Sequence, residues 1–300
     1  MSSGRRHLRA RRPVTLLTLA EKKASGDPIV MITAYDHPSA CIADEVGVDL
    51  VLVGDSAANV ILGYDSTVPV TVDEMLVLTR AVRRGLTTPM LVADLPFGSY
   101  EVSNEQAVLT AQRFVKEGGA DAVKLERGGP SVDRVRAVVA AGIPVMGHVG
   151  LTPQSATSLG GYRVQGRTAD HAEQMIADAL HLQEAGCFAV VFEAVPAQVT
   201  ELAVPLLDSV VIGIGAGPAT DGQVLVWHDL LGLRTGHVAK FVRQFADLRP
   251  GLVSGVAAYA EAVRTRHFPA EEHTYAIAAE ELDALRSRLA PGGGEQEAQA

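Results

Sequence analysis

The chain holds 300 residues, with 26 basic and 35 acidic side chains, a formal net charge of −9 and a mean hydropathy of +0.16. This length fits one large domain or two small ones, and the 47% hydrophobic content excludes a largely disordered or collagen-like chain. No stretch approaches the roughly 18 uninterrupted apolar residues that a membrane-spanning helix needs, so we expect no membrane segment.

The charge is unevenly distributed along the chain. The first twelve residues carry five arginines and no acid, so removing their charge from −9 leaves −14 on the rest. Such an acidic body argues against nucleic acid as a partner, because that binding depends on neutralising phosphates. We expect residues 1–13 to be a flexible Arg-rich arm, residues 14–289 to be a single catalytic domain and residues 290–300 to be a disordered tail.

Two further features indicate the compartment. The apolar run Val14–Ala20 is short and is followed at once by charged residues, so it predicts an amphipathic helix that caps the domain rather than a secretory signal. Cys41 and Cys187 lie far apart in apolar surroundings, which predicts reduced core thiols. We therefore expect a cytoplasmic protein.

Short β-branched runs alternate with helical patterns along the middle of the chain, as in βα units of a parallel sheet. In chain order, strands are predicted at Ile29–Thr33, Leu50–Val53, Met90–Ala93, Ala122–Leu125, Pro144–Gly147, Ala189–Phe192, Val210–Gly213 and Val224–Trp227. Helices are predicted at Val72–Arg84, Asn104–Glu117, Ser131–Ala141, Ala169–Ala185, Gly251–Arg266 and Ala276–Leu289. Eight strands in about 200 residues favour a closed (β/α)₈ barrel (TIM barrel) of class α/β, with one N-terminal helix and further C-terminal helices.

Polar side chains follow at least five of these strands. They are Asp55 and Ser56, Asp94, Lys124 and Glu126, His148, and Glu193. A single acid after a strand is as often a helix cap or turn residue. Because chemistry in barrels of this kind sits at the C-terminal ends of the strands, five successive polar ends predict one site on that rim.

Lys124 and Glu126 are two residues apart on one strand, so both point into the barrel while Val123 and Leu125 point outward. One interpretation is a buried salt bridge that only fixes packing. The other is a metal site, since Asp55 and Asp94 add two more carboxylates that a cation would neutralise. These ligands are hard oxygens, which favour Mg²⁺ or Mn²⁺ over Zn²⁺.

Such an ion would be chelated by an α-keto acid through its carboxylate and keto oxygens. Lys124 would then neutralise the substrate carboxylate or a developing enolate oxygen. Glu193 stands two strands from Glu126 and remains as a free base, with His148 between them to orient it or to relay protons.

Seven stretches carry a resemblance to a known family. They are Ile32–Asp36, Leu52–Ser56, Asp65–Thr71, Ala93–Phe97, Gly147–Ser155, Gly160–Arg167 and Ile212–Gly217, within residues 31–273. In these stretches the chain resembles the ketopantoate (3-methyl-2-oxobutanoate) hydroxymethyltransferase family. The resemblance implies a barrel like those of phosphoenolpyruvate mutase and isocitrate lyase. It also implies Mg²⁺, 5,10-methylenetetrahydrofolate as one-carbon donor, a role in pantothenate synthesis, and a homo-oligomer of eight or ten subunits.

Carried over position by position, the resemblance implies that Asp55 and Asp94 bind the metal directly and that Glu126 completes its shell, through water or directly. It further implies that the keto acid contacts four side chains, those of Asp55, Ser56, Asp94 and Lys124. Glu193 would be the proton acceptor. One departure is Ala57-Ala58, where the family more often has Leu-Gly; losing the glycine would change the freedom of the substrate loop.

The roles of two glycine-rich segments, and two alternative functions of the protein, also have to be considered. The connection Val149–Arg167 is long and glycine-rich, which fits a cover over the site or a structural or intersubunit loop. The glycines of Gly213–Gly217 do not match a dinucleotide fingerprint and predict a tight turn after a strand. A Mg²⁺-dependent carbon–carbon lyase or mutase on the same barrel is the alternative enzyme, and a non-catalytic, metal-dependent keto-acid sensor is the alternative binding protein.

Overall fold

The computed structural model describes residues 12–155, 164–236 and 238–290. Contacts divide the chain into two units, one that ends at Asp247 and one that begins at Leu248. The first unit contains the whole barrel. The second contains α10 (Arg249–Arg264) and α11 (Ala279–Leu289). Both helices were expected to belong to the single domain of residues 14–289, and this domain boundary stays a prediction. All of the expected tail except residue 290, and all of the expected arm except residues 12 and 13, lie outside the described residues.

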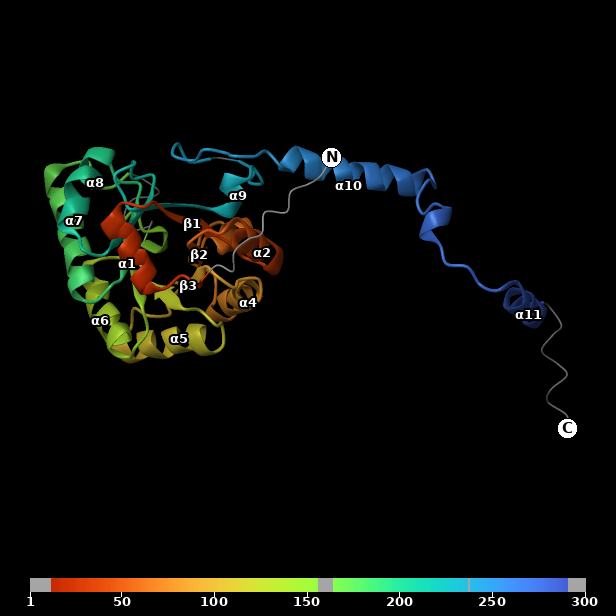
Figure 1. Ribbon diagram of the computed structural model, residues 1–300, viewed down its shortest axis with the longest axis horizontal. Helices are drawn as coiled ribbons and strands as arrows, with labels where there is room; N and C mark the ends of the chain where they lie inside the picture. The colour runs from red at the N-terminus through yellow and green to blue at the C-terminus, as the bar shows by residue number, and fades with distance from the viewer. Residues whose placement is uncertain (1–11, 156–163, 237, 291–300) are drawn as a thin grey trace. The chain divides into compact units, whose positions relative to one another are not determined.

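Eight parallel strands form a closed barrel in sequence order, β1 to β8 (Figure 1). They are β1 (Ile29–Thr33), β2 (Leu50–Val53), β3 (Met90–Asp94), β4 (Ala122–Lys124), β5 (Val145–Gly150), β6 (Ala189–Glu193), β7 (Val210–Ile214) and β8 (Gly222–Leu225). The predicted fold class and all eight strands are confirmed. The last strand begins two residues before its predicted start, because Gly222 and Gln223 pair with both β7 and β1, a tertiary effect.

The helices lie mainly outside the barrel. They are α1 (Leu16–Ser25), α2 (His37–Val46), α3 (Ala57–Val60), α4 (Val72–Arg83), α5 (Asn104–Lys116), α6 (Val132–Ala140), α7 (Ala169–Glu184), α8 (Ala197–Ala203) and α9 (Trp227–Leu230), with 3₁₀ turns at η1 (Gly129–Ser131), η2 (Pro153–Ser155), η3 (Val204–Leu206) and, in the second unit, η4 (Glu271–His273). The predicted N-terminal helix is α1, which begins at a capping box between Thr15 and Thr18. In the described part of the chain, no helix is both long and apolar enough to cross a bilayer.

Two apolar clusters sit on the two faces of the strands. The smaller fills the barrel and includes Val92, Ala122 and Met146, and the larger lies between strands and helices and includes Val123 and Leu125. Because successive side chains alternate between the faces, Ala122 inside the barrel places Lys124 and then Glu126 on the same side above it. The predicted inward direction of these two charged residues is thus confirmed.

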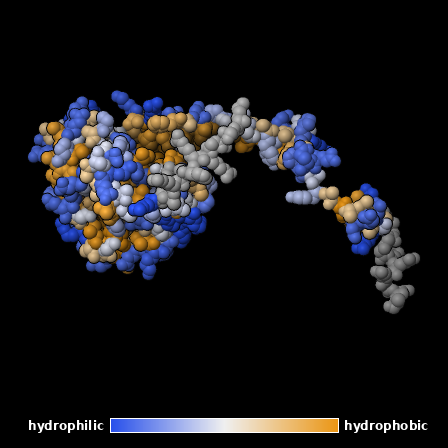
Figure 2. Space-filling model, in the orientation of Figure 1, coloured by the Kyte–Doolittle hydropathy of each residue, from blue (hydrophilic) through white to orange (hydrophobic). Residues whose placement is uncertain are grey.

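The outer face of β1 and β8 is incompletely covered. The described connection from β7 to β8, residues 215–221, holds no helix, and Val30 on β1 remains 49% exposed. A groove of about 1230 Å³ runs past this face. Figure 2 shows apolar patches among the polar residues on the surface of the barrel unit.

Asp44 ties α2 to the chain entering β3. Its carboxylate accepts hydrogen bonds from the backbone N–H groups of Thr87 and Thr88, each at 2.8 Å, and from both threonine hydroxyls at 2.6 and 2.9 Å. Burial raises the pKa of Asp44, but these bonds outweigh it and hold the pKa below its usual value.

We expect Asp44→Asn to lower the free energy of unfolding by about 1–3 kcal/mol at pH 7, because two N–H and two O–H donors lose a charged acceptor. A carboxyl group whose pKa is lower in the folded than in the unfolded protein stabilises the fold fully above its unfolded-state pKa of about 3.9. This stabilisation is lost as the pH falls through the folded-state pKa. Urea denaturation at pH 7, 4 and 3 should therefore show that the difference in free energy of unfolding between wild type and Asp44→Asn becomes smaller as the pH falls. Asp133→Asn, at an exposed acid, serves as control. A stability difference between wild type and Asp44→Asn that did not change with pH would contradict the role of the Asp44 charge.

The two cysteines differ in exposure, which corrects the expectation that both are core thiols. Cys187 is buried, and burial raises its pKa to about 12, whereas Cys41 lies exposed on α2. Since only the thiolate reacts, we expect an aromatic disulfide reagent to modify one thiol per native chain and two per unfolded chain. Rapid modification of both thiols in the native protein would show that Cys187 is accessible.

Candidate active site

All seven predicted site residues line one cavity of about 540 Å³ at the C-terminal ends of the strands. The cavity lining includes Asp55, Ser56, Asp94, Lys124, Glu126, His148 and Glu193. They come from five successive strands or the turns that follow them, β2 to β6. Helix caps would have pointed such residues away from one another, so their convergence favours the single-site interpretation.

A buried ion pair links β3 and β4. Asp94 and Lys124 are directly paired in the strand register, and Lys124 Nζ lies 2.7 Å from Asp94 Oδ1, with both side chains at most 4% exposed. Burial raises the pKa of Asp94 despite the opposing charge of Lys124. For Lys124, burial lowers the pKa, but Asp94, Glu126 and Asp55 outweigh it and raise the pKa, so the ammonium stays charged.

Asp55 and Ser56 lie in the turn between β2 and α3. The backbone N–H of Asp55 donates to Asp94 Oδ2 at 2.9 Å, which joins the two predicted metal ligands. Burial and the neighbouring charges of Glu126 and Asp94 raise the pKa of Asp55 well above its usual value. The Ser56 hydroxyl pairs with the phenol of Tyr35 at 2.8 Å.

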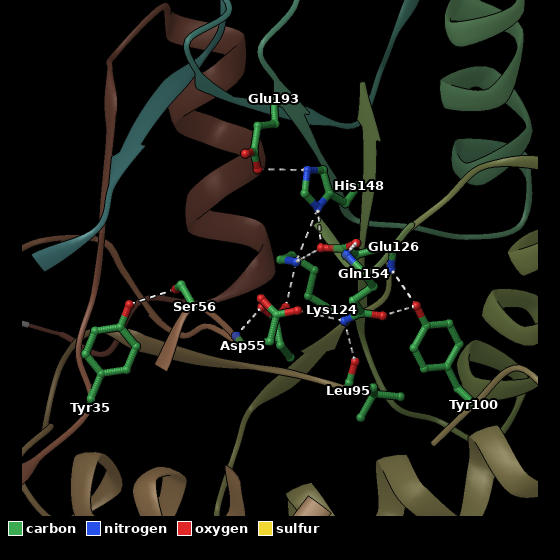
Figure 3. A network of polar contacts seen from close by, with 11 residues as sticks. Tyr35, Asp55, Ser56, Leu95, Tyr100, Lys124, Glu126, His148, Gln154 and Glu193 are labelled. Atoms are coloured by element: carbon green, nitrogen blue, oxygen red, sulfur yellow. Dashed lines mark hydrogen bonds and ion pairs between the residues drawn. The ribbon is translucent and has the colours of Figure 1, made fainter. Parts of the chain in front are cut away.

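His148 connects two carboxylates across the cavity (Figure 3). Its Nδ1 lies 3.3 Å from Glu126 Oε1, and its Nε2 lies 3.3 Å from Glu193 Oε2. Burial and the charge of Lys124 lower the pKa of His148, but the two carboxylates outweigh them and raise it to about 9. The ring is therefore protonated at neutral pH, and each nitrogen lies within ion-pair distance of one acid.

One oxygen of Glu193 faces His148, the residue that was expected to orient this base. The Glu193 side chain is 17% exposed, the most open of these acids, while that of Glu126 is 1% exposed. Gly150 allows the ends of β5 and β6 to approach closely beside Glu193. Its φ is +90°, and a Cβ there would collide with the Glu193 carbonyl. That carbonyl accepts a hydrogen bond from the Leu151 N–H at 2.8 Å. The base candidate is thus fixed on one side and open to the cavity on the other.

Sequence reasoning missed two residues of this network, Gln154 and Tyr100. The Gln154 amide contacts Asp55, and its backbone N–H contacts Glu126; the Tyr100 hydroxyl contacts the Gln154 amide. Gln154 lies in the 3₁₀ turn η2 and Tyr100 in a loop, so strand alternation gives no direction for either side chain. The available signal was the position of Gln154, only four residues after β5 in a stretch without charged side chains.

The cavity suits a divalent cation by charge and by donor chemistry. Among its seven predicted residues, four carboxyl groups outnumber the two cationic groups, Lys124 and His148, by two. Among the described residues, no cluster of three or more His, Cys, Asp or Glu side chains is placed to hold one ion. Mg²⁺ commonly takes one or two carboxylates and completes its six oxygens with water and substrate, so Asp55 and Asp94 fit it.

Glu126, like Asp94 with Lys124 and the Asp55 N–H, has both of its oxygens engaged. One of its oxygens faces His148, and the other accepts the backbone N–H of Gln154 at 3.0 Å. Burial raises its pKa, but His148, Lys124 and Gln154 outweigh this and lower the pKa. A contact with the ion through water leaves both of these partners in place.

Three sequence features around the cavity have structural outcomes. Ala57 and Ala58 are fully buried in α3, in helical conformation, so no glycine is needed there. Gly213–Gly217 forms the end of β7 and the predicted tight turn, with positive φ at Gly215 and Gly217. The connection 149–167 continues through η2, but residues 156–163 lie outside the described part of the chain, and its role as a cover stays a prediction.

Solved structures with this fold include a phosphonopyruvate hydrolase in complex with oxalate and Mg²⁺, with a TM-score of 0.58 and 12% identity, covering 90% of this chain and 94% of that one. Another is 2,3-dimethylmalate lyase, a member of the PEP mutase/isocitrate lyase superfamily, with a TM-score of 0.54 and 15% identity, covering 91% and 98%. At such identities the likeness establishes the fold alone, and it confirms the predicted barrel type.

Sequence relatives are much closer. A 3-methyl-2-oxobutanoate hydroxymethyltransferase of Rhodococcus jostii (strain RHA1) is 55% identical over 257 residues, 86% of this chain and 89% of that protein. One of Moorella thermoacetica is 54% identical over 262 residues, 87% and 97%. A family model described as ketopantoate hydroxymethyltransferase matches residues 13–271. The chain therefore belongs to the ketopantoate hydroxymethyltransferase family.

Proposed function

We propose that this enzyme transfers the one-carbon unit of 5,10-methylenetetrahydrofolate to 3-methyl-2-oxobutanoate with the help of Mg²⁺ and yields 2-dehydropantoate, a precursor of pantothenate. The observation that carries the proposal is the cavity in which the four carboxyl groups of Asp55, Asp94, Glu126 and Glu193 gather around Lys124 and His148. Family membership favours a transferase over a carbon–carbon lyase, and the complete set of charged groups argues against a sensor without turnover.

The reaction requires a proton to leave C3 of the keto acid, a tertiary carbon whose C–H is poorly acidic in water. Asp55 and Asp94 would hold the ion, which when bound supplies positive charge at the keto oxygen and so lowers the energy of the enolate. Lys124, fixed by Asp94, adds a second positive charge beside the substrate oxygens. Burial of both side chains keeps water from screening these charges.

Glu193 is the group that removes the proton. Its free oxygen faces the cavity, and its other oxygen is oriented by His148. The carbanion then forms a C–C bond to the one-carbon unit, and both bonds between that carbon and the folate nitrogens N5 and N10 break. Water supplies the hydroxyl oxygen, and the two nitrogens take up one proton from Glu193 and one from water as tetrahydrofolate leaves. His148, held by Glu126 on its far side, stabilises the Glu193 carboxylate until it accepts the proton.

The direct test mixes the purified protein with 3-methyl-2-oxobutanoate, methylenetetrahydrofolate and Mg²⁺ and follows the products by NMR. We expect 2-dehydropantoate only when all three are present. Cleavage of the keto acid without folate would instead identify a lyase, and keto-acid binding without any product would identify a sensor.

We also propose that the enzyme works as a homo-oligomer in the cytoplasm. Exposed apolar side chains on the barrel unit, such as Val30, Leu109 and Leu202, support burial against other copies. Two unpaired cysteines support a reducing compartment. Light scattering coupled to size-exclusion chromatography gives the subunit number, for which eight or ten is expected.

A further inference from the structure

Gln154 occupies a buried position in η2, between the turns that follow β2 and β3. Its amide nitrogen donates to Asp55 Oδ2 at 3.0 Å and to the Leu95 carbonyl at 3.1 Å. Its amide oxygen accepts the Tyr100 hydroxyl at 2.7 Å (Figure 3). Because a carboxylate and a carbonyl only accept, the nitrogen end of the amide must face them, and the orientation of the side chain is determined.

The backbone of Gln154 reaches a second acid of the site. Its N–H donates to Glu126 Oε2 at 3.0 Å, while the N–H of Glu126 itself points to the Tyr100 hydroxyl at 3.4 Å. One residue therefore binds one oxygen of Asp55 and one oxygen of Glu126. The second oxygen of Glu126 lies against His148. Gln154 occupies Oδ2 of Asp55, and among the described residues none hydrogen-bonds to its Oδ1, which leaves that oxygen for a ligand.

We propose that Gln154 is a positioning residue for the reaction: it fixes the Asp55 carboxylate in the orientation that binds the divalent ion, and Tyr100 acts by holding the Gln154 amide. This inference rests on the proposed function of the cavity. Partners that orient a ligating carboxylate typically contribute a factor of about 10–100 in metal affinity. A free carboxylate in this cavity would lose entropy on every binding event, whereas one held by Gln154 is already oriented.

The test compares three variants with wild type by Mn²⁺ binding, measured by electron paramagnetic resonance without substrate. Gln154→Met keeps the length of the side chain but removes its hydrogen bonds, and we expect it to weaken Mn²⁺ binding about 10–100-fold. Gln154→Glu places an acceptor opposite two acceptors and should bind at least as poorly. Tyr100→Phe should weaken binding less, and the double variant Gln154→Met/Tyr100→Phe should match Gln154→Met, because Tyr100 acts through Gln154.

Gln183→Met is the matched control, since the Gln183 amide oxygen accepts the Ser209 N–H at 2.8 Å, on α7 and away from the cavity. It should lower the melting temperature about as much as Gln154→Met while leaving Mn²⁺ affinity unchanged. Wild-type Mn²⁺ affinity in Gln154→Met would overturn the inference. So would a double variant in which the losses of Mn²⁺ affinity from Gln154→Met and Tyr100→Phe add in full. A wild type that bound no Mn²⁺ would overturn it together with the metal assignment, whereas one that bound Mn²⁺ but formed no product would overturn the proposed function alone.

Discussion

Replacing Glu193 by glutamine is expected to slow deuterium incorporation at C3 of 3-methyl-2-oxobutanoate in heavy water by about 10²–10⁴-fold, the usual contribution of a general base. The amide keeps the size of the side chain but cannot accept the proton. Because Glu193 makes its one contact of this network with His148 and is the most exposed of the site's acids, the fold and the Asp55–Asp94 pair should be unaffected. The exchange is followed by NMR with Mg²⁺ and without folate, which isolates proton removal from carbon transfer.

Glu184→Gln is the control for this experiment. Glu184 is an exposed acid at the end of α7, so its variant should exchange at the wild-type rate. Mg²⁺ affinity in Glu193→Gln should also stay near that of wild type. Unchanged exchange in Glu193→Gln would remove Glu193 from the role of base and would direct attention to other groups that face C3.

Replacing Asp94 by alanine is expected to weaken Mg²⁺ binding by about 100-fold or more, beyond the 10–100-fold effect of a residue that only orients a ligand. Keto-acid affinity should fall in parallel, because Lys124 loses its partner at 2.7 Å and no longer has a fixed position beside the substrate. Removing one member of a buried ion pair also costs about 3–5 kcal/mol, so the variant should melt at a lower temperature. Isothermal titration measures both affinities.

A second variant separates metal binding from stability. Asp94→Asn keeps the shape and can still accept the Asp55 N–H, so it should fold better than Asp94→Ala while losing most of the Mg²⁺ affinity. Asp73→Asn, at an acid with a side chain 81% exposed, should bind Mg²⁺ as wild type does. Undiminished Mg²⁺ affinity in both Asp94 variants would exclude Asp94 as a ligand.

Strand positions and the inward direction of the charged residues could be predicted from the sequence, because both depend on local properties. β-branched runs define each strand, and the two-residue period that puts Ala122 inside the barrel also puts Lys124 and Glu126 there. Even so, β8 began two residues away from its predicted start, since Gly222 has no preference for strands and pairs only because β1 and β7 flank it.

The sequence by itself determined the barrel and the acids and lysine of its rim, because strand period and the parallel order of strands place them without further information. Only the tertiary structure decided how these groups share their contacts: that His148 faces Glu126 as well as Glu193, that Glu126 gives one oxygen to Gln154, and that Cys41 is exposed. Such contacts join loops and strands far apart in the chain, as Gln154 and Asp55 are, and their geometry exists only once the barrel has closed.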